Sequence, residues 1–550
     1  MSHIFSTLQR DSMRRLMSEV TFDMIVIGGG ITGSGIALDA AARGLKTALI
    51  ERKDFAFGTS SRSGKLIHGG LKYLKNYEFS IVREVGTERD IVYRNARHLV
   101  YPIQMLFPLI QGESFNPFTL KVGLTAYDRL AGVKKEERHQ LHSKEQTFQR
   151  EPLFNKNTVE GSGEYVEYRT DDSRLTMETA KTAAEMDAAV LNYAEVYDFT
   201  SDDNNQISGV AVKDELTGET FTVSGTMVVN AAGPWVDEVR KKDEPVSGKH
   251  MVHAKGIHLV FSYDTLPVKS SIYFQHNGRM IAVIPKGDTT YVGSTESLYY
   301  DDMDDIHVYQ SECDYLIGCL HDMFPALTIT KDDIISSWAG VRPLIGYDDS
   351  EPSELSRHDE IFESDSGLIT IAGGKLTGYR KMAERVLNYA AKRHYLKLSP
   401  SRTSGIPLSG GHFASAEDIT AYCSSLARTY DHLQLSMQEI EEFVFRYGSN
   451  AGALLQQMES VNHFYEDPVI RNTVAEAMYT VKQEMAASLE DFYDRRTSYL
   501  LFQPKKVTKT LEAVSSAMAK ELGWKPVRLE REKERIRYLL QKSVTFLPYS

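Results

Sequence analysis

The stretch 22–52 constrains the fold more than any other part of the chain. An apolar, β-branched run at 22–27 suits a buried parallel strand, and a glycine turn follows it at 28–33. Residues 34–43 are rich in alanine and contain no proline, and residues 46–50 have the composition of a second strand. This order of strand, glycine turn, helix and strand predicts a βαβ unit.

The glycine turn has the spacing of a dinucleotide-binding site. A pyrophosphate reaches the N–H groups at a helix N-terminus only where no Cβ intervenes. Gly28 would make the tight turn, Gly30 would let the phosphate approach, and Gly33 would let the helix pack on the strand. Glu51 lies about 20 residues beyond the turn, where a carboxylate accepts hydrogen bonds from ribose hydroxyls. We therefore predict a dinucleotide site here.

The composition excludes some classes of protein. With 550 residues and 42% hydrophobic side chains, the chain is expected to form two or three globular domains. Its net charge of −12 leaves no excess of cations to displace counterions from nucleic acid, so we expect no nucleic-acid partner. Three cysteines without metal-ligand spacing fit a reducing compartment, and we expect no metal site.

Two segments combine apolar and basic side chains, although we expect neither a secretory signal nor a transmembrane helix. Residues 1–20 form an amphipathic segment that either docks on the protein or inserts into a membrane surface. Residues 525–542 place basic side chains around an apolar stripe, which suits either a solvated helix or contact with anionic lipid.

The chain is expected to divide into a leading segment, 1–20, an oxidoreductase region, 21–400, and a helical C-terminal domain, 401–550. Short alternating strands at 251–298 predict an antiparallel sheet, and a segment rich in proline, glycine and serine at 400–411 predicts a linker. Cofactor-binding parts are expected mainly at 21–80, 150–250 and 335–395, and the substrate sheet mainly at 81–149 and 251–334.

Further motifs follow the glycine turn in a specific order. They are TSSRSGKLIHGGLKYL at 59–74, VNAAGPWV at 229–236, KGIH at 255–258, GVRPL at 340–344 and GGKLTGYRK at 373–381. With them the chain resembles the FAD-dependent glycerol-3-phosphate dehydrogenases, within the glycine/D-amino-acid-oxidase-like flavoprotein superfamily. The resemblance implies an α/β fold with a Rossmann-like FAD-binding domain, an antiparallel-sheet substrate domain and an all-helical C-terminal domain.

The resemblance implies FAD as the cofactor and assigns its contacts. The glycine turn and Glu51 would hold the ADP half, Val196 would contact adenine, and the turn at 373–377 would lie by the pyrimidine end of the flavin. A helix N-terminus there would stabilise the negative charge of a reduced flavin. The complete set of expected contacts is Gly28, Gly30, Gly33, Glu51, Thr59, Ser60, Ser61, Ser63, His68, Val196, Gly374, Lys375, Leu376 and Thr377.

A phosphate monoester substrate requires cations in its pocket. Because the planar fork of arginine suits phosphate oxygens, Arg342 in GVRPL is the leading phosphate ligand. The resemblance adds Lys375, Arg357 and Tyr73. Relatives commonly place arginine beside that tyrosine, whereas this chain has Lys72, which keeps the charge but loses the bidentate geometry.

The implied reaction oxidises the C2 alcohol of sn-glycerol 3-phosphate to the ketone of dihydroxyacetone phosphate, with hydride passing to flavin N5. The hydroxyl proton requires a base, or a cation must stabilise the developing alkoxide. His258 and Lys255 are the leading candidates and His68 is the second choice, while Arg342 and Lys375 complete the catalytic set.

The sequence does not decide between two electron acceptors, a quinone and dioxygen. In the family the acceptor is a membrane quinone, which would place this cytoplasmic protein peripherally on the inner face of the cell membrane. The related oxidases use dioxygen and release hydrogen peroxide. Two other functions are considered: an amine or amino-acid oxidase, and a non-catalytic flavin sensor. The oligomeric state is a separate question, for which a homodimer is one answer.

Overall fold

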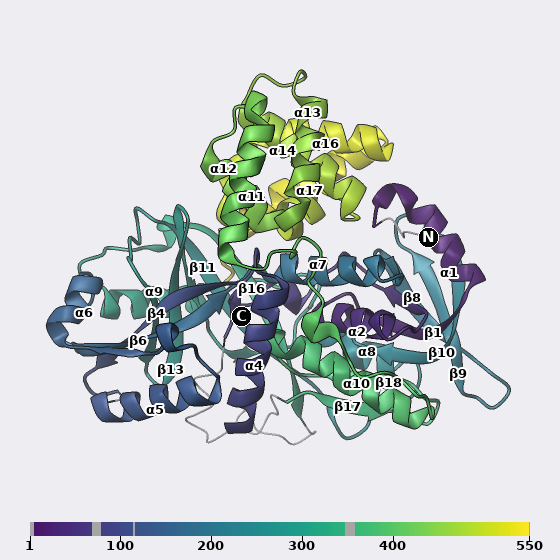
Figure 1. Ribbon diagram of the computed structural model, residues 1–550, viewed down its shortest axis with the longest axis horizontal. Helices are drawn as coiled ribbons and strands as arrows, with labels where there is room; N and C mark the ends of the chain where they lie inside the picture. The colour runs from purple at the N-terminus through teal and green to yellow at the C-terminus, as the bar shows by residue number, and fades with distance from the viewer. Residues whose placement is uncertain (1–4, 69–78, 114–115, 347–357, 549–550) are drawn as a thin grey trace.

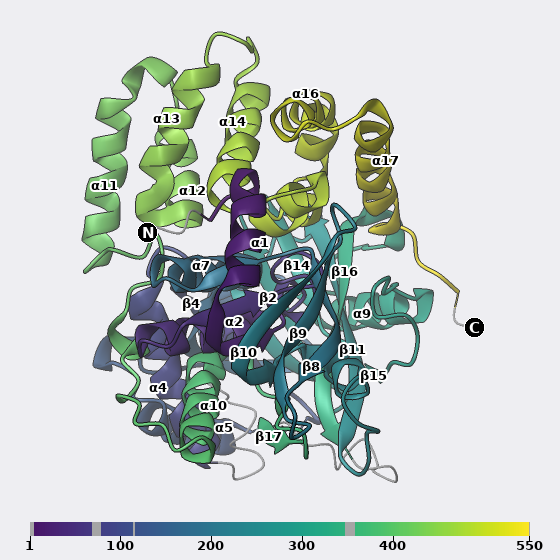
Figure 2. The same cartoon turned by 90° about the vertical axis from the view of Figure 1, so that its right-hand side faces the viewer.

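The computed structural model describes residues 5–68, 79–113, 116–346 and 358–548. Two sheets lie side by side, and the C-terminal helices form a separate layer above both of them (Figures 1 and 2). This arrangement confirms the expected fold class, with a Rossmann-like part, a second sheet and a helical C-terminal region.

The first sheet contains the βαβ unit. Its strand order within the described residues is β17-β18-β10-β1-β2-β7, with β8 and β9 extending from β10. Strands β18, β10, β1, β2 and β7 are parallel, so their carboxyl ends meet along one edge. The bounds are Thr21–Ile27 for β1, Thr47–Ile50 for β2, Ala189–Leu191 for β7, Ala194–Ser201 for β8, Ile207–Asp214 for β9, Thr220–Asn230 for β10, Glu360–Glu363 for β17 and Ile369–Ala372 for β18.

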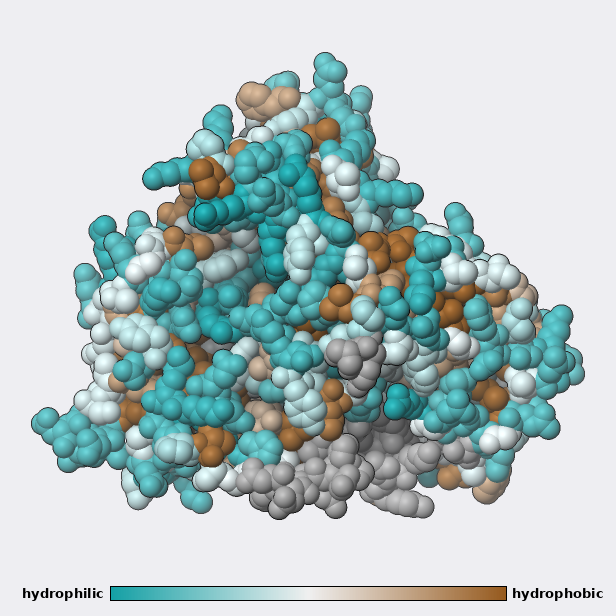
Figure 3. Space-filling model, turned by 180° about the vertical axis from the view of Figure 1, so that it is seen from behind, coloured by the Kyte–Doolittle hydropathy of each residue, from teal (hydrophilic) through white to brown (hydrophobic). Residues whose placement is uncertain are grey.

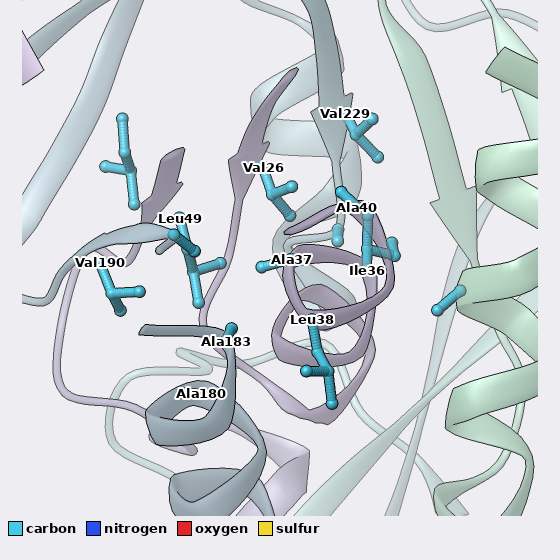
Figure 4. Close-up of a cluster of buried hydrophobic side chains, with 14 of the residues drawn as sticks. Val26, Ile36, Ala37, Leu38, Ala40, Leu49, Ala180, Ala183, Val190 and Val229 are labelled. Atoms are coloured by element: carbon cyan, nitrogen blue, oxygen red, sulfur yellow. The ribbon is translucent and has the colours of Figure 1, made fainter. Parts of the chain in front are cut away.

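Small side chains let helices pack closely on this sheet. Helix α2 (Ile31–Ala42) presents Ala37 and Ala40 beside Val26 of β1, while α7 (Asp172–Glu185) places Ala180 and Ala183 near Val190 (Figure 4). Helix α10 (Tyr379–Arg393) packs against α2, and α8 (Val236–Arg240) follows β10. The alanine-rich sequence of α2 is thus explained by burial on almost every side.

The second sheet is mostly antiparallel and carries the other wall of the site. Its order within the described residues is β15-β11-β14-β13-β12-β4-β6-β3, with β16 on β11 and β5 on β6. The bounds are Leu66–Ile67 for β3, Tyr101–Ile110 for β4, Gln140–His142 for β5, Val159–Arg169 for β6, His250–Ser262 for β11, Ser271–His276 for β12, Arg279–Lys286 for β13, Thr289–Gly293 for β14, Ser297–Leu298 for β15 and Ile334–Gly346 for β16.

Three strands of the second sheet lie in ranges that were expected mainly to bind the cofactor. They are β3, β6 and β16, in the ranges 21–80, 150–250 and 335–395. Among the described residues, the helices that flank this sheet are α4 (Phe79–Asn95), α5 (Pro117–Leu130), α6 (Lys144–Arg150) and α9 (Gln310–Met323). Strand β16 belongs to the second sheet because it pairs with β11, which is distant in sequence. The composition of a segment does not encode such long-range pairing.

The C-terminal region is helical, with a single π-helical segment at Asp491–Arg496 among the described residues. Its helices are α11 (Ala416–Thr429), α12 (Met437–Tyr447), α13 (Ala451–Val461), α14 (Pro468–Gln483), α15 (Tyr499–Phe502), α16 (Pro504–Leu522) and α17 (Pro526–Lys542). The preceding segment at 400–411 is packed rather than loose, because the N–H groups of Leu408 and Ser409 donate to Asn95 and Thr182.

The N-terminal segment is docked on the protein. Helix α1 (Arg10–Glu19) buries Met13 and Met17 in the core of the first sheet, and the Arg10 guanidinium pairs with buried Asp214 at 3.0 Å. These apolar side chains are therefore not available for insertion into lipid. Of the two alternatives for the segment 1–20, the described part of it agrees with the docked helix.

The basic C-terminal stretch is also engaged within the molecule. On α17, Lys533 and Arg537 pair with Glu512, Arg535 pairs with Glu490, and Lys542 pairs with Asp305. Most of its charge is therefore compensated, which weakens the case for contact with anionic lipid through this helix.

No helix in the described ranges has both the length and the apolar character needed to cross a bilayer. On the face shown in Figure 3, hydrophilic side chains predominate and hydrophobic ones lie in small separate groups.

Candidate active site

A cavity of about 660 Å³ lies between the two sheets, at the carboxyl edge of the parallel strands. Its first wall comes from the ends of β1, β2, β10 and β18, and its second wall comes from β11, β13, β14 and β16. Ligands of open α/β sheets bind outside the carboxyl ends of the strands. The geometry therefore places a cofactor beside the first wall.

The glycine turn has the backbone shape that the spacing predicted. Gly28 has a φ of +108°, and a Cβ there would lie 2.6 Å from the carbonyl oxygen of Ala231. A Cβ on Gly33 would lie 1.9 Å from the Gly28 oxygen, so this glycine permits helix and strand to pack. Gly30 and the first turn of α2 line the cavity, whereas Gly33 lies behind them. The helix N-terminus thus faces an open space suited to an anion.

Glu51 lies at the end of β2 and lines the same cavity. One carboxylate oxygen accepts the Gly29 N–H at 2.6 Å, and the other accepts the Lys53 N–H at 2.7 Å. Burial raises the pKa of Glu51, and the two N–H groups oppose that rise by stabilising the ionised form. These two bonds fix the orientation of the Glu51 carboxylate. Its remaining lone pairs can accept hydrogen bonds from hydroxyl groups.

The hydroxyl residues after Phe57 divide into two groups. Thr59 and Ser60 line the cavity: Thr59 donates to the Val341 carbonyl at 2.6 Å, and Ser60 accepts the Ile31 N–H at 3.0 Å.

Ser61 and Ser63 have other partners. Ser61 is buried outside the cavity lining and its hydroxyl donates to the Gly58 carbonyl at 3.4 Å. Ser63 reaches the lining, but its hydroxyl donates to Asp172 at 2.6 Å. The Ser61 side chain is therefore placed for loop structure rather than for cofactor contact.

The turn after β18 closes the cavity at its far end. Gly373 and Gly374 have φ of +74° and +93°, which brings Lys375, Leu376 and Thr377 to the lining just before α10. The Thr377 hydroxyl donates to the His68 carbonyl at 3.4 Å. His68 and Val196 also line the cavity, and their contacts with FAD stay a prediction.

His258 lies on β11 and lines the second wall. Its imidazole is stacked on Trp338, and a Cβ on Gly293 would lie 2.1 Å from the ring. Burial lowers the pKa of His258 to about 3, and Arg342 and Lys65 lower it further in the same direction. The ring is therefore neutral at pH 7 and able to accept a proton.

Arg342 projects from β16 into the cavity. Its guanidinium donates to the Ser294 hydroxyl at 2.8 Å and lies 3.8 Å from a Glu296 carboxylate oxygen. A Cβ on Gly256 would lie 3.2 Å from the guanidinium, so that glycine makes room for it. Partly exposed cations of this kind can exchange a loose protein partner for a substrate anion.

The structure corrects the placement of Lys255. Residues 255 and 258 are three apart on β11, so their side chains point to opposite faces. Lys255 lines a separate cavity of about 350 Å³, where its ammonium pairs with Glu312 at 2.9 Å and donates to the His307 carbonyl at 3.0 Å. Burial lowers the pKa of Lys255, and Glu312 opposes that shift. It is not a base beside His258.

Three expected substrate ligands, Lys72, Tyr73 and Arg357, lie outside the described residues. Other lining residues were not singled out from the sequence. Arg279 gave no signal beyond being basic, whereas Arg62 and Trp235 stand in the quoted motifs TSSRSGKLIHGGLKYL and VNAAGPWV. A Cβ on Gly58 would lie 2.6 Å from the Trp235 ring, so this tryptophan packs directly on the loop after β2.

Comparison with known proteins agrees with this site. A family model described as FAD dependent oxidoreductase matches residues 23–380, and one described as the C-terminal domain of alpha-glycerophosphate oxidase matches residues 401–529. Fold and cavity thus define an FAD-dependent oxidoreductase. The aerobic glycerol-3-phosphate dehydrogenase of Bacillus subtilis is 44% identical over 555 residues, covering 99% of each chain. This chain belongs to the aerobic glycerol-3-phosphate dehydrogenase family.

Two further relatives agree over the full length. The aerobic glycerol-3-phosphate dehydrogenase of Staphylococcus aureus is 41% identical over 98% of each chain. The structure of the Bacillus halodurans glycerol-3-phosphate dehydrogenase complexed with FAD is 38% identical, covers 100% of each chain and has a TM-score of 0.85. An L-alpha-glycerophosphate oxidase from Mycoplasma pneumoniae shares the fold at 18% identity and a TM-score of 0.53, covering 70% of this chain and 97% of its own.

The cofactor of this family is FAD, and the residues present fit it. The open space over Gly30, the N-terminus of α2 and the oriented Glu51 carboxylate suit an ADP moiety. The cavity continues from there past Thr59 to the turn at 373–377, which gives room for the flavin part of FAD.

Proposed function

We propose that the protein oxidises sn-glycerol 3-phosphate at C2 to dihydroxyacetone phosphate. One observation carries this proposal: Arg342, the buried neutral His258 and the predicted dinucleotide site line the same cavity. The full-length likeness to named glycerol-3-phosphate dehydrogenases supports the same substrate.

Arg342 and Lys375 would bind the phosphate. Both line the cavity, and a dianionic monoester needs more than one cation to offset its loss of hydration. Among the described residues, the guanidinium is held by Ser294 and by a carboxylate 3.8 Å away, so its fork can turn to phosphate oxygens. Lys375 stands at the turn before α10, where the helix N-terminus adds positive potential.

His258 would accept the proton of the C2 hydroxyl. Its low pKa makes the free imidazole a weak base, but a bound phosphate dianion favours the protonated ring and raises that pKa. The stack with Trp338 keeps the ring in one orientation as the proton transfers. Arg342 would stabilise negative charge on the reacting oxygen from the same wall.

FAD, when bound, supplies hydride acceptance at flavin N5. Glu51 and the glycine turn would hold its ADP half, while Thr59, Ser60 and the backbone at 373–377 would position the other half. The apolar lining at Leu66, Tyr291 and Leu344 would exclude water from the reacting atoms.

The reaction is tested by product analysis. Holoenzyme supplied with an artificial electron acceptor is expected to convert sn-glycerol 3-phosphate to dihydroxyacetone phosphate and to leave glycine and sarcosine unchanged. Turnover of an amine in preference to glycerol 3-phosphate would favour the amino-acid oxidase alternative instead.

The electron acceptor that we propose is a membrane quinone, with dioxygen as the alternative. A homodimer is a separate prediction about the oligomeric state. A quinone with an isoprenoid tail stays in the bilayer, so the protein would have to contact the lipid surface. Helix α5 offers apolar side chains for that contact: Phe118 is 75% exposed and Val122 is 54% exposed, one turn apart. Lys121 and Arg129 supply exposed cations on the same helix.

The position of α5 also suits electron exit. It lies at the edge opposite the C-terminal helices (Figures 1 and 2). Tyr273 and Met280 line the cofactor cavity and also pack against the apolar cluster beneath α4 and α5. We therefore propose this edge, at the inner face of the cell membrane, in place of either terminus.

Vesicle flotation distinguishes these surfaces. Binding to anionic vesicles at low salt should fall several-fold in Phe118→Ser/Val122→Ser, while Phe464→Ser, at a 76% exposed position of the C-terminal domain, should bind normally. Equal binding by all three proteins would remove α5 from the contact. Rapid reduction of dioxygen with no gain from added quinone would favour the oxidase alternative.

A further inference from the structure

The segment 54–62, which we name the cofactor loop, lies directly on the glycine turn. The Ala56 N–H donates to the Gly29 carbonyl at 3.1 Å, and the Ser60 hydroxyl accepts the Ile31 N–H at 3.0 Å. Through these bonds, a displacement of the loop would disturb the N-terminus of α2. The shape of the cofactor site therefore depends on what holds the loop from its other side.

Part of that support comes from the π-helical segment of the C-terminal domain. Asp54 is fully buried and accepts hydrogen bonds from Arg495 at 2.7 Å and from Arg496 at 2.6 and 2.9 Å. Burial alone would raise the pKa of Asp54, but the two guanidinium groups outweigh it and lower the pKa to about 2. The carboxylate is thus ionised and tied to a domain more than 400 residues away in sequence.

A second ion pair holds the other end of the loop. Both terminal nitrogens of Arg62 donate to the two carboxylate oxygens of Asp494, whose side chain is 3% exposed. Arg62 and Thr59 also line the cofactor cavity. A cavity of about 130 Å³ lies beside the ion pair and is lined both by this part of the loop and by the C-terminal domain.

We propose that Asp494 and Arg495 are positioning residues for FAD: they hold the cofactor loop against the glycine turn in the conformation that binds the cofactor. This gives the helical C-terminal domain a role in cofactor retention. A π-helical turn supplies the needed geometry, because it places the neighbouring side chains of 494, 495 and 496 toward the loop. The inference rests on the FAD site and not on the proposed electron acceptor.

The test measures FAD affinity rather than turnover. Asp494→Asn keeps the side-chain shape but removes the charge partner of Arg62, and the dissociation constant of FAD, measured by flavin fluorescence on reconstituted apoprotein, should rise about tenfold. With FAD saturating, KM for sn-glycerol 3-phosphate should change less than about twofold, because Arg342 lies on the other wall.

A matched control separates positioning from general loss of stability. Glu476 is a buried carboxylate of the same domain that pairs with Arg446 and does not contact the cofactor loop. Glu476→Gln should lower the thermal midpoint of the protein while leaving FAD affinity unchanged. An equal loss of affinity in both variants would overturn the proposal.

A double-mutant cycle tests the route through Arg62. In an Arg62→Gln background, Asp494→Asn should cause a smaller further loss of FAD affinity, because the Arg62 pair is already broken and the 3.4 Å contact of Asp494 with Arg495 remains. Additive losses, or unchanged affinity in Asp494→Asn alone, would overturn the proposal. If Asp494→Asn does not yield folded protein, Arg62→Lys replaces it, since lysine cannot make the bidentate contact and should also weaken FAD binding.

Discussion

The imidazole of His258 stacks on the indole of Trp338, with ring centroids 4.6 Å apart and planes inclined by 8°. The two residues are direct cross-strand partners on β11 and β16. The sheet therefore fixes the orientation of the ring, and as the proposed base His258 would have little freedom left to lose.

His258→Asn should lower kcat by about 10²–10⁴-fold, because an amide cannot accept the proton. FAD binding should be retained. His321, which lies on α9 outside the cavity and bonds the Ile329 carbonyl, supplies the control His321→Asn, with kcat unchanged. Stopped-flow flavin reduction measures the step, and unchanged reduction in His258→Asn would exclude this residue as the base.

The pH profile gives an independent check of His258. Because burial lowers its pKa to about 3, the free enzyme keeps the ring neutral throughout pH 5–8. The profile of kcat/KM should therefore show no ionisation of His258 in that range. A limb near pH 6.5 that disappears in His258→Asn would contradict the environment described for this ring.

Arg342→Lys should raise KM strongly. Lysine keeps the charge but loses the bidentate fork, and loss of such a charge-assisted contact costs about 2–3 kcal/mol, or roughly 30–150-fold. Flavin content should be unchanged, since the residues that we propose to bind FAD lie on the first wall and Arg342 lies on the second. Steady-state kinetics with sn-glycerol 3-phosphate measure the effect, and a KM within twofold of the wild-type value would remove Arg342 from phosphate binding.

The parts of the site that are local in sequence were predictable. The glycine turn and Glu51 follow from a short pattern whose geometry the backbone enforces, and Gly28 has the left-handed φ that the pattern requires. To predict which face of a sheet a side chain occupies, one must know the bounds of its strand. The KGIH motif predicts both Lys255 and His258 at the site, whereas the alternation of β11 places their side chains on opposite faces.

Contacts between distant segments were not predictable. The docking of α1 depends on a buried site for Arg10 at Asp214, and the support of the cofactor loop depends on Arg495 and Arg496 meeting Asp54. Each arginine is ordinary in its local sequence. Only the fold brings the partners within hydrogen-bond distance, so charge counting at 525–542 also overestimated the free positive charge of α17.

The protein should lose stability as pH falls. His98 is buried, neither ring nitrogen has a hydrogen-bond partner within the described structure, and burial lowers its pKa from 6.5 to about 3. Below pH 6.5 the unfolded chain binds a proton that the native state does not, so the free energy of unfolding falls by up to about 1.4 kcal/mol per pH unit until pH 3. His258 adds a second contribution of the same sign.

His98→Leu should therefore flatten the dependence of the thermal midpoint on pH between 6.5 and 4. His432 is exposed beside Glu459, and His432→Leu should retain the wild-type slope. Scanning calorimetry of the apoproteins across this range measures both slopes. An unchanged slope in His98→Leu would show that His98 does not contribute to the acid sensitivity.

The most direct test is anaerobic mixing of purified holoenzyme with sn-glycerol 3-phosphate. Because one cavity is lined by Arg342 and His258, the proposed phosphate ligand and proton acceptor, and by the residues that fit FAD, the visible flavin absorbance should bleach in the absence of any other electron acceptor. One equivalent of dihydroxyacetone phosphate should appear for each flavin reduced. A flavin that stays oxidised with sn-glycerol 3-phosphate, while dithionite reduces it, would contradict the assignment of this cavity as the site of glycerol 3-phosphate oxidation.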